Sequence, residues 1–127
     1  MKPRHLFIAD GAVSTLLGLA FLILPGLVLT IVGIPPRDQA RQLLASFVGA
    51  ALLGIGAFQL LARDEAESRA GLAFMRAMLV FDLAGIVLGV IGSMSGTLNF
   101  MGWVIALLFV VVGVPHAYWG FVKPVRG

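Results

Sequence analysis

The sequence contains no cysteine and very little charge. Its 127 residues include nine Lys or Arg and six Asp or Glu, so charged side chains make up 12% of the chain, against about 25% in an ordinary soluble domain. The absence of cysteine excludes disulfides, thiolate metal sites and cysteine nucleophiles. The scarcity of charge leaves too little polar surface to cover a water-soluble fold. With 60% hydrophobic residues and a mean hydropathy of +1.04, the chain is predicted to be an integral membrane protein.

The sequence also lacks the common motifs of catalysis and phosphate binding. It has no G-x-S-x-G nucleophile elbow, no Walker loop and no G-x-G-x-x-G following a strand. The net charge is only +3, and the basic residues are spread among the loops. This spread favours lipid headgroups over nucleic acid as the anionic neighbour. We predict no catalytic residue and no nucleic-acid partner.

Four apolar segments are long enough to cross a bilayer, which requires about 20 residues of helix. They cover residues 6–24, 43–62, 77–96 and 99–119. The predicted fold class is therefore all-α: one transmembrane domain, 1–127, built as a four-helix bundle. Asn99 is expected to cap the last helix after a turn at Gly96 and Thr97.

A short apolar stretch, LVLTIVGIPP (27–36), separates the first two segments. It is too short to span and ends in two prolines, which predicts an interfacial or re-entrant element. The N-terminal MKPRH before an apolar run imitates a signal peptide. Asp10 interrupts that run and no A-x-A site follows near Pro25, so the first segment is expected to be retained.

The distribution of Lys and Arg predicts the orientation. Seven of the nine lie on one side of the four spans (Lys2, Arg4, Arg63, Arg69, Arg76, Lys123 and Arg126), and only Arg37 and Arg41 lie on the other. The positive-inside rule places the seven in the cytoplasm, with both termini. Trp103, Tyr118 and Trp119 lie near the ends of the last segment, where aromatic belts belong. The predicted location is a bacterial inner membrane.

Small residues form one stripe on each predicted helix. At about 100° per residue, the glycines share these stripes with a few polar side chains. The predicted packing positions are Gly18, Gly49, Gly56, Gly85, Gly89, Gly102 and Gly113, accompanied by Ala45, Ala106 and Ser93. In lipid, helices associate through small residues and interhelical hydrogen bonds. The polar side chains on these stripes are therefore predicted to face protein.

These polar side chains form the candidate site. It consists of Asp10, Ser14, Gln59, Arg76, Asp82 and His116. Each is predicted to lie near the cytoplasmic end of its helix, with His116 beside a carboxylate and Arg76 pairing with Asp10 or reaching the headgroups. Buried charge costs several kcal/mol unless it is paired. One interpretation is a structural hydrogen-bond network, another is proton exchange or headgroup binding by Asp82 and His116, and a third is snorkelling to the interface.

Two cofactor hypotheses also arise from these residues. Two carboxylates and a histidine can supply three metal ligands, but no local motif has the required spacing, so no metal is predicted. His5 and His116 can in principle ligate a haem from two faces. His5 is expected among headgroups beside Arg4, and the prediction is therefore no bound cofactor.

Three stretches carry a family resemblance: GIPP (33–36), ARQLLASFVGAALLGIGAFQLLAR (40–63) and LNFMGWVIALLFVVVG (98–113). Together with a first helix ending in proline, they resemble small bacterial four-helix membrane proteins of the DoxX-like type. The resemblance implies a membrane partner of a quinone-linked oxidoreductase, which would bring a quinone. It transfers no catalytic residue to this chain.

Small multidrug transporters are four-helix proteins of similar size. They carry an essential glutamate in the first helix, where this chain has only Asp10, nearer the helix end than a midplane site requires. The function predicted first is a non-catalytic membrane or accessory subunit, with a membrane-protein partner or a second copy as its neighbour. The alternatives are the quinone-linked partner and a small proton-coupled transporter using Asp82 or Asp10.

Overall fold

The computed structural model describes residues 1–123, and this part of the chain is helical with no strand. The long helices are α1 (Pro3–Ile23), α3 (Gln39–Leu61), α4 (Arg69–Met94) and α5 (Met101–Ala117). The shorter elements are α2 (Pro25–Ile31), a single 3-10 turn η1 (Arg63–Glu65), and the π-helical turn η2 (Tyr118–Val122), which continues α5. The predicted all-α fold is confirmed. Arg126, counted above for the orientation, lies outside the described residues.

Local sequence signals set most of the helix ends. Pro3 and Pro25 lie in the first turns of α1 and α2, where a missing N–H costs nothing. The carboxylate of Asp38 caps α3 by accepting from Arg41 N at 2.8 Å, and Ser68 Oγ caps α4 by accepting from Gly71 N at 3.1 Å. Asn99 Oδ1 accepts from Met101 N, the first residue of α5, at 2.9 Å, but the N-cap position of α5 is Phe100, so Asn99 lies one residue before the predicted cap position.

Four helices are long and apolar enough to cross a membrane: Pro3–Ile23, Gln39–Leu61, Arg69–Met94 and Met101–Val122. Each contains most of one predicted apolar segment. The stretch 27–36 forms part of α2 and the loop after it. At about 1.5 Å per residue, the seven residues of α2 are too short to cross, which agrees with the predicted short element. These features describe a multi-pass membrane-spanning protein.

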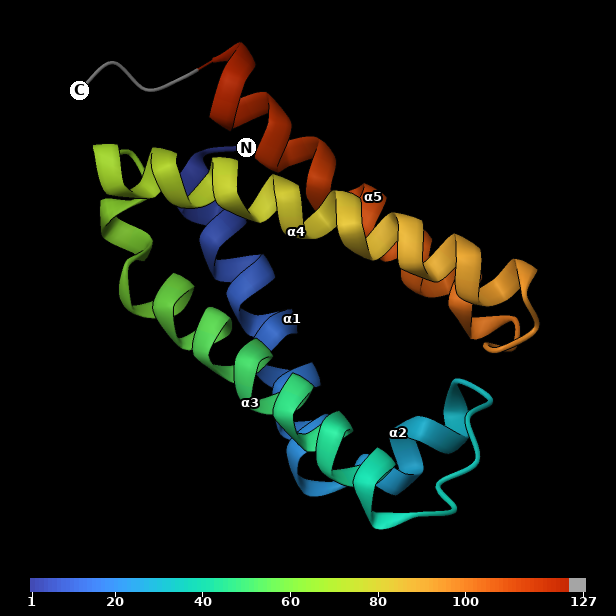
Figure 1. The fold of residues 1–127 in the computed structure, drawn as a ribbon. Helices are drawn as coiled ribbons and strands as arrows, with labels where there is room; N and C mark the ends of the chain where they lie inside the picture. Colours follow the sequence, from blue (N-terminus) through green and yellow to red (C-terminus); the bar gives the residue numbers. More distant parts are fainter. Residues whose placement is uncertain (124–127) are drawn as a thin grey trace.

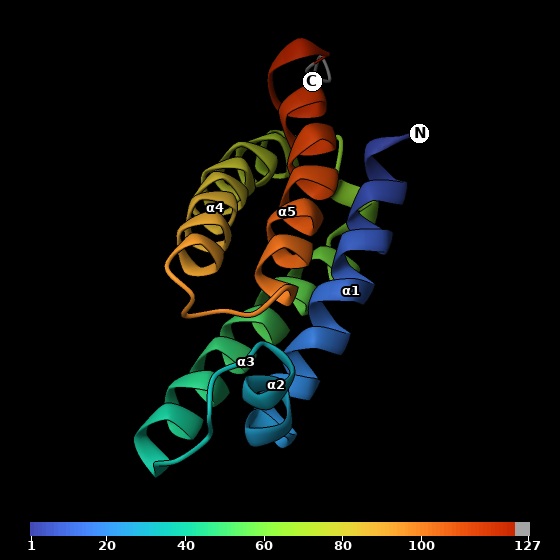
Figure 2. The same ribbon diagram turned by 90° about the vertical axis from the view of Figure 1, so that its right-hand side faces the viewer.

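The four long helices form two antiparallel pairs that diverge in a V (Figure 1). Helix α1 packs along α3, and α4 packs along α5. The pairs meet at the end that holds the N-terminus, η1 and the start of α4, and they separate toward the end that holds α2 (Figures 1 and 2). We call these the closed end and the open end.

Glycines allow the close approach within each pair. A Cβ at Gly49 of α3 would lie 2.5 Å from Leu22 N, and one at Gly18 of α1 would lie 2.6 Å from Leu53 N. In the second pair, a Cβ at Gly89 would lie 3.0 Å from Gly102 O. These contacts involve backbone atoms, so the small-residue stripes are the surfaces along which the helices touch.

An apolar core fixes the closed end. Leu6, Phe7, Ala66 and Met75 are buried together there, with Phe74 and Trp119 packed against them. Arg4 of α1 also pairs with Asp64 of η1 at 2.8 Å. The mixed charges of the segment DEAESR (64–69) predict a solvated loop. Most of this loop is exposed, but Ala66 is only 1% exposed. The connection between the two helix pairs is therefore anchored.

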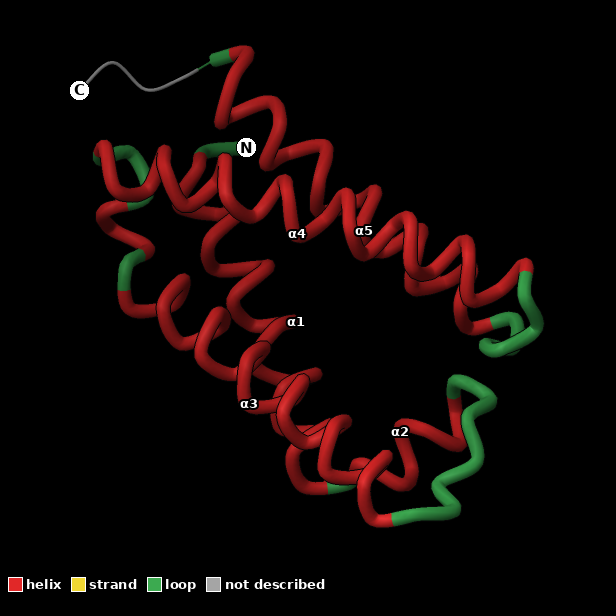
Figure 3. The backbone as a smooth tube through the Cα atoms, in the orientation of Figure 1, coloured by secondary structure: helices red, strands yellow, loops and turns green. Residues whose placement is uncertain are grey.

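Asn99 joins the two pairs at the open end. Its backbone N–H donates to Val32 O at 3.0 Å, and its Nδ2 donates to Ile31 O at 2.9 Å. Gly33 is in the left-handed region with φ 86°, and a Cβ there would lie 2.9 Å from Asn99 Cβ. The loop after α2 and the turn before α5 thus meet across the open end, where both are drawn as loop segments (Figure 3).

Candidate functional site

Four buried polar side chains, one from each long helix, lie together near the closed end. Asp10 comes from α1, Gln59 from α3, Asp82 from α4 and His116 from α5. Gln59 and His116 are 0% exposed, Asp82 is 1% exposed and Asp10 is 7% exposed. We call these four residues the polar cluster. The cluster spans the junction between the two helix pairs.

His116 lies between the two carboxylates. Its Nδ1 is 2.7 Å from Asp82 Oδ2, a contact within the second helix pair. Its Nε2 is 3.5 Å from Asp10 Oδ2, across the junction between the pairs. The same Asp10 oxygen accepts a hydrogen bond from Gln59 Nε2. A chain of polar contacts therefore runs from α4 through α5 and α1 to α3.

The small-residue stripes bring these groups together. Gly113 lies one turn before His116, and a Cβ there would lie 3.2 Å from Asp82 Cβ. Gly11 follows Asp10, and a Cβ at this position would lie 3.0 Å from Gln59 Cβ. Close approach of the backbones lets short side chains such as Asp reach their partners directly. The same stripes that pack the helices also position the cluster.

The cluster is rich in acceptors and poor in donors. Across residues 1–123, the ion pairs of Asp10 and Asp82 are both with His116. Two ionised carboxylates and a neutral imidazole would leave two uncompensated negative charges in a buried site, at a cost of several kcal/mol. The contacts from His116 and Gln59 are therefore what offsets the burial of the two carboxyl groups.

Two polar atoms in the cluster have unused hydrogen-bonding capacity. His116 Nε2 and Gln59 Oε1 are buried with no hydrogen-bond partner among the residues that the structure describes. A proton on His116 Nε2 would point toward Asp10. The contact across the junction is longer than the contact between His116 Nδ1 and Asp82 Oδ2, which measures 2.7 Å.

Two predicted members of the site, Ser14 and Arg76, are not among the four residues of the polar cluster. Ser14 is buried one turn from Asp10, on the same face of α1. Arg76 is outside the cluster: its Nε donates to Gly120 O at 2.9 Å, and its guanidinium lies 5.0 Å from the centre of the Phe121 ring. Of the two predicted alternatives for Arg76, pairing with Asp10 is wrong, because Arg76 bonds the carbonyl of Gly120 in η2 while Asp10 pairs with His116. Contact of Arg76 with the headgroups stays a prediction.

The predicted depth of Asp82 needs a correction as well. The apolar segment begins near residue 77, but α4 begins at Arg69, so Asp82 lies well inside its helix. At about 1.5 Å per residue it is about 20 Å from the start of α4. Asp82 still belongs to the cluster because α5 approaches α4 closely at Gly113 and brings His116 Nδ1 within 2.7 Å of Asp82 Oδ2.

The residues present do not fit a metal ion or a haem. Within residues 1–123, no three His, Cys, Asp or Glu side chains are arranged to hold a metal ion. His5 is exposed on α1, whereas His116 is enclosed, with both ring nitrogens facing carboxylates. Both ring nitrogens of His116 are therefore directed at carboxylates and not at His5.

Some polar groups at helix contacts were not predicted from the sequence. Thr15 Oγ1 is buried and has no hydrogen-bond partner within residues 1–123, and a Cβ at Gly56 would lie 2.4 Å from it. Asn99 was predicted as a cap alone, yet its amide also bonds Ile31 O. No local pattern signals this contact, because it joins residues far apart in the chain.

Comparisons with known proteins give no assignment. No family model, curated protein or solved structure matches the chain. The function is therefore inferred from the side chains of this chain and the contacts between them.

Proposed function

We propose that the protein is a non-catalytic membrane subunit in which the polar cluster locks two helix pairs together at one end. The observation that carries this proposal is the enclosure of the cluster. Its four side chains are at most 7% exposed, and they contact one another across all four long helices. A catalytic or carrier site must be reachable by its substrate. Hydrogen bonds that hold helices together are instead stronger where water is excluded.

The outer surface supports an accessory role. Large apolar side chains are exposed on every long helix, among them Leu16, Leu61, Leu88 and Leu107. Most of each helix therefore faces lipid or the helices of a neighbouring membrane protein. The orientation with both termini in the cytoplasm, inferred from the basic residues, would put the closed end on the cytoplasmic side.

The proposal is tested by mild extraction of the tagged chain from its native membrane, followed by native mass spectrometry. An accessory subunit is expected as a complex of fixed stoichiometry with another membrane protein. The double variant Asp82→Leu with His116→Leu should keep that complex, because it replaces the hydrogen bond between these two side chains by an apolar contact between the same helices. A chain that is always recovered alone would contradict the accessory role.

A second candidate function, proton-coupled transport, is favoured by His116 Nε2, which has no hydrogen-bond partner among the described residues. Since this atom faces Asp10 across the junction, proton uptake there would alter the contact between the two pairs, as a proton-coupled carrier requires. Such a carrier predicts flux driven by a pH gradient in liposomes, and Asp82→Asn should abolish it. The resemblance to DoxX-like proteins stays a third hypothesis, which predicts a quinone that copurifies with the chain.

A further inference from the structure

An apolar groove lies at the open end of the V, away from the polar cluster. It has a volume of about 480 Å³, within the range of about 300–1,000 Å³ typical of ligand sites. Helices α1, α2 and α3 and the connection after α2 line it, and the turn between α4 and α5 adds one residue; the lining includes Phe21, Leu29, Leu44, Val48, Arg41 and Thr97. The groove therefore lies on the first helix pair, next to the turn between α4 and α5.

The walls of this groove suit a hydrocarbon chain. Leu44 and Val48 come from the part of α3 that crosses the membrane, and they are 65% and 49% exposed. A groove between transmembrane helices opens to lipid, where water would find few hydrogen-bond partners. An acyl chain is the molecule that the bilayer supplies to such a surface.

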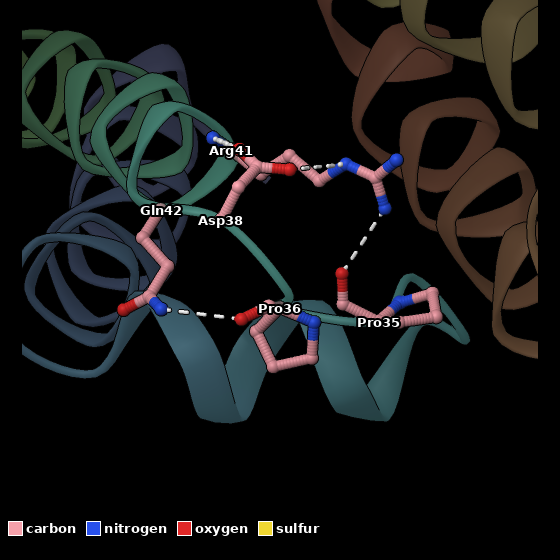
Figure 4. Close-up of polar contacts among 5 residues, drawn as sticks. All are labelled: Pro35, Pro36, Asp38, Arg41 and Gln42. Carbon is pink, nitrogen blue, oxygen red and sulfur yellow. Dashed lines mark hydrogen bonds and ion pairs between the residues drawn. The ribbon is translucent and has the colours of Figure 1, made fainter.

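Arginine side chains supply the polar end of the site. Arg41 lines the groove, and its Nη1 donates to Pro35 O at 3.2 Å while its Nε pairs with Asp38 at 3.1 Å. Figure 4 shows these contacts and the guanidinium directed away from α3 toward the other helix pair. Arg37 is exposed in the loop that precedes α3, next to Asp38 in the sequence. The segment 37–41 therefore carries one net positive charge at the start of α3.

The spacing of these groups matches an amphiphile. Arg41 and Val48 are seven residues apart on α3, which corresponds to about 10 Å along the helix axis. The guanidinium is held by Pro35 and Asp38 near the start of α3, at the depth of the headgroups, and the apolar wall extends from there into the membrane. Arginine binds phosphate oxygens well because its planar fork presents several donors.

We infer that the groove holds one acyl chain of an anionic phospholipid, with the phosphate at Arg41 and Arg37. The charge at the mouth is complementary to a single phosphodiester, and the apolar wall below it accepts the tail. The site does not depend on the role of the polar cluster, which lies at the other end of the V.

The experiment uses the full chain in mild detergent with either phosphatidylglycerol or phosphatidylcholine added at equal concentration. Native mass spectrometry then counts the lipids retained per chain. One retained phosphatidylglycerol is expected, in preference to phosphatidylcholine. Arg41→Gln should weaken retention about tenfold, as expected for the loss of a charge-assisted contact, and Val48→Trp should reduce it by filling the groove.

Two matched variants control for charge and size. Arg63→Gln removes an exposed arginine near the closed end, and Leu107→Trp adds the same ring to a 62% exposed position on α5; both should retain the lipid as the wild type does. Circular dichroism checks that each variant folds. If Arg41→Gln loses helicity, the comparison of Val48→Trp with Leu107→Trp decides the result.

Three outcomes would overturn the inference. The first is equal retention of the two lipids by the wild type, and the second is unchanged retention in Val48→Trp. The third is a dimer without bound lipid, which would mean that a second copy of the chain covers the groove.

Discussion

Nδ1 of His116 lies 2.7 Å from Oδ2 of Asp82, and both side chains are enclosed where the two helix pairs meet. This enclosure changes the expected effect of substitutions at the pair. A buried carboxylate whose partners reach water can be replaced by an apolar residue at little cost. Here the partner is His116, which is 0% exposed. Removing Asp82 therefore leaves the Nδ1 atom of His116 buried without its hydrogen-bond partner.

We therefore expect Asp82→Leu to lower the free energy of unfolding by about 1–3 kcal/mol, the cost of leaving a buried polar group unpaired. The double variant Asp82→Leu with His116→Leu should recover part of this loss, because His116 is no longer left unpaired, while Asp10 keeps its hydrogen bond from Gln59 and loses only the longer contact with His116. Unfolding in detergent mixtures, measured for both single variants and the double variant, gives the coupling energy. Additive effects of the two substitutions would contradict a direct interaction.

Glycine packing within the first helix pair is tested by Gly49→Ala. The added methyl group would lie 2.5 Å from Leu22 N and 2.7 Å from Gly18 O, so α1 must move away from α3. We expect a destabilisation of about 1–3 kcal/mol, typical of overpacking. The measurement is the midpoint of thermal unfolding in a fixed detergent.

Gly54→Ala on the same helix is the matched control for this variant. Nothing lies within 4 Å of a Cβ at Gly54, so this substitution should leave the midpoint unchanged or raise it through helix propensity. Equal losses at Gly49 and Gly54 would mean that helix propensity, and not packing, governs the effect.

Arg76 is expected to stabilise the turn after α5. It donates to Gly120 O within the π-helical turn η2, so Arg76→Ala should cost about 1–3 kcal/mol locally. Hydrogen exchange of residues 118–122 should become faster, while exchange in α1 and α3 stays the same. Arg63→Ala is the control, because the contacts of this arginine with Leu60 O and Asp64 are both local and lie away from η2. Unchanged exchange at 118–122 would rule out this role.

The bond from Asn99 to the loop after α2 is expected to limit the opening of the V. Asn99→Ala removes the side-chain bond to Ile31 O and the bond from Met101 N at the start of α5, each worth about 1 kcal/mol. Since the chain has no cysteine, spin labels can be placed at Leu43→Cys on α3 and Met94→Cys on α4. Pulsed electron spin resonance should show a broader distance distribution in Asn99→Ala than in the parent.

Ser95→Ala is the control for the Asn99 variant. It removes a hydroxyl that bonds only within the turn between α4 and α5, so the distance distribution should keep its width. If Asn99→Ala leaves the width unchanged as well, Asn99 does not hold the open end.

The sequence determined the helices and the faces that they bury. Apolar length gave the four membrane-crossing helices, since the thickness of the hydrocarbon core sets that length. Helical periodicity placed Asp10, Asp82 and His116 on the same stripes as the packing glycines, and all three are buried. These properties are local, because each depends only on residues within a few turns of one helix.

The tertiary structure decided how the four faces meet. The periodicity of small and polar residues identifies the buried face of each helix. It does not set the crossing angle between helices, so a parallel bundle and a V are equally compatible with the sequence pattern. The divergence of the pairs, the partner of Arg76 and the bond from Asn99 to Ile31 all follow from contacts between residues far apart in the chain. Such contacts depend on the crossing of whole helices, which no short stretch of sequence encodes.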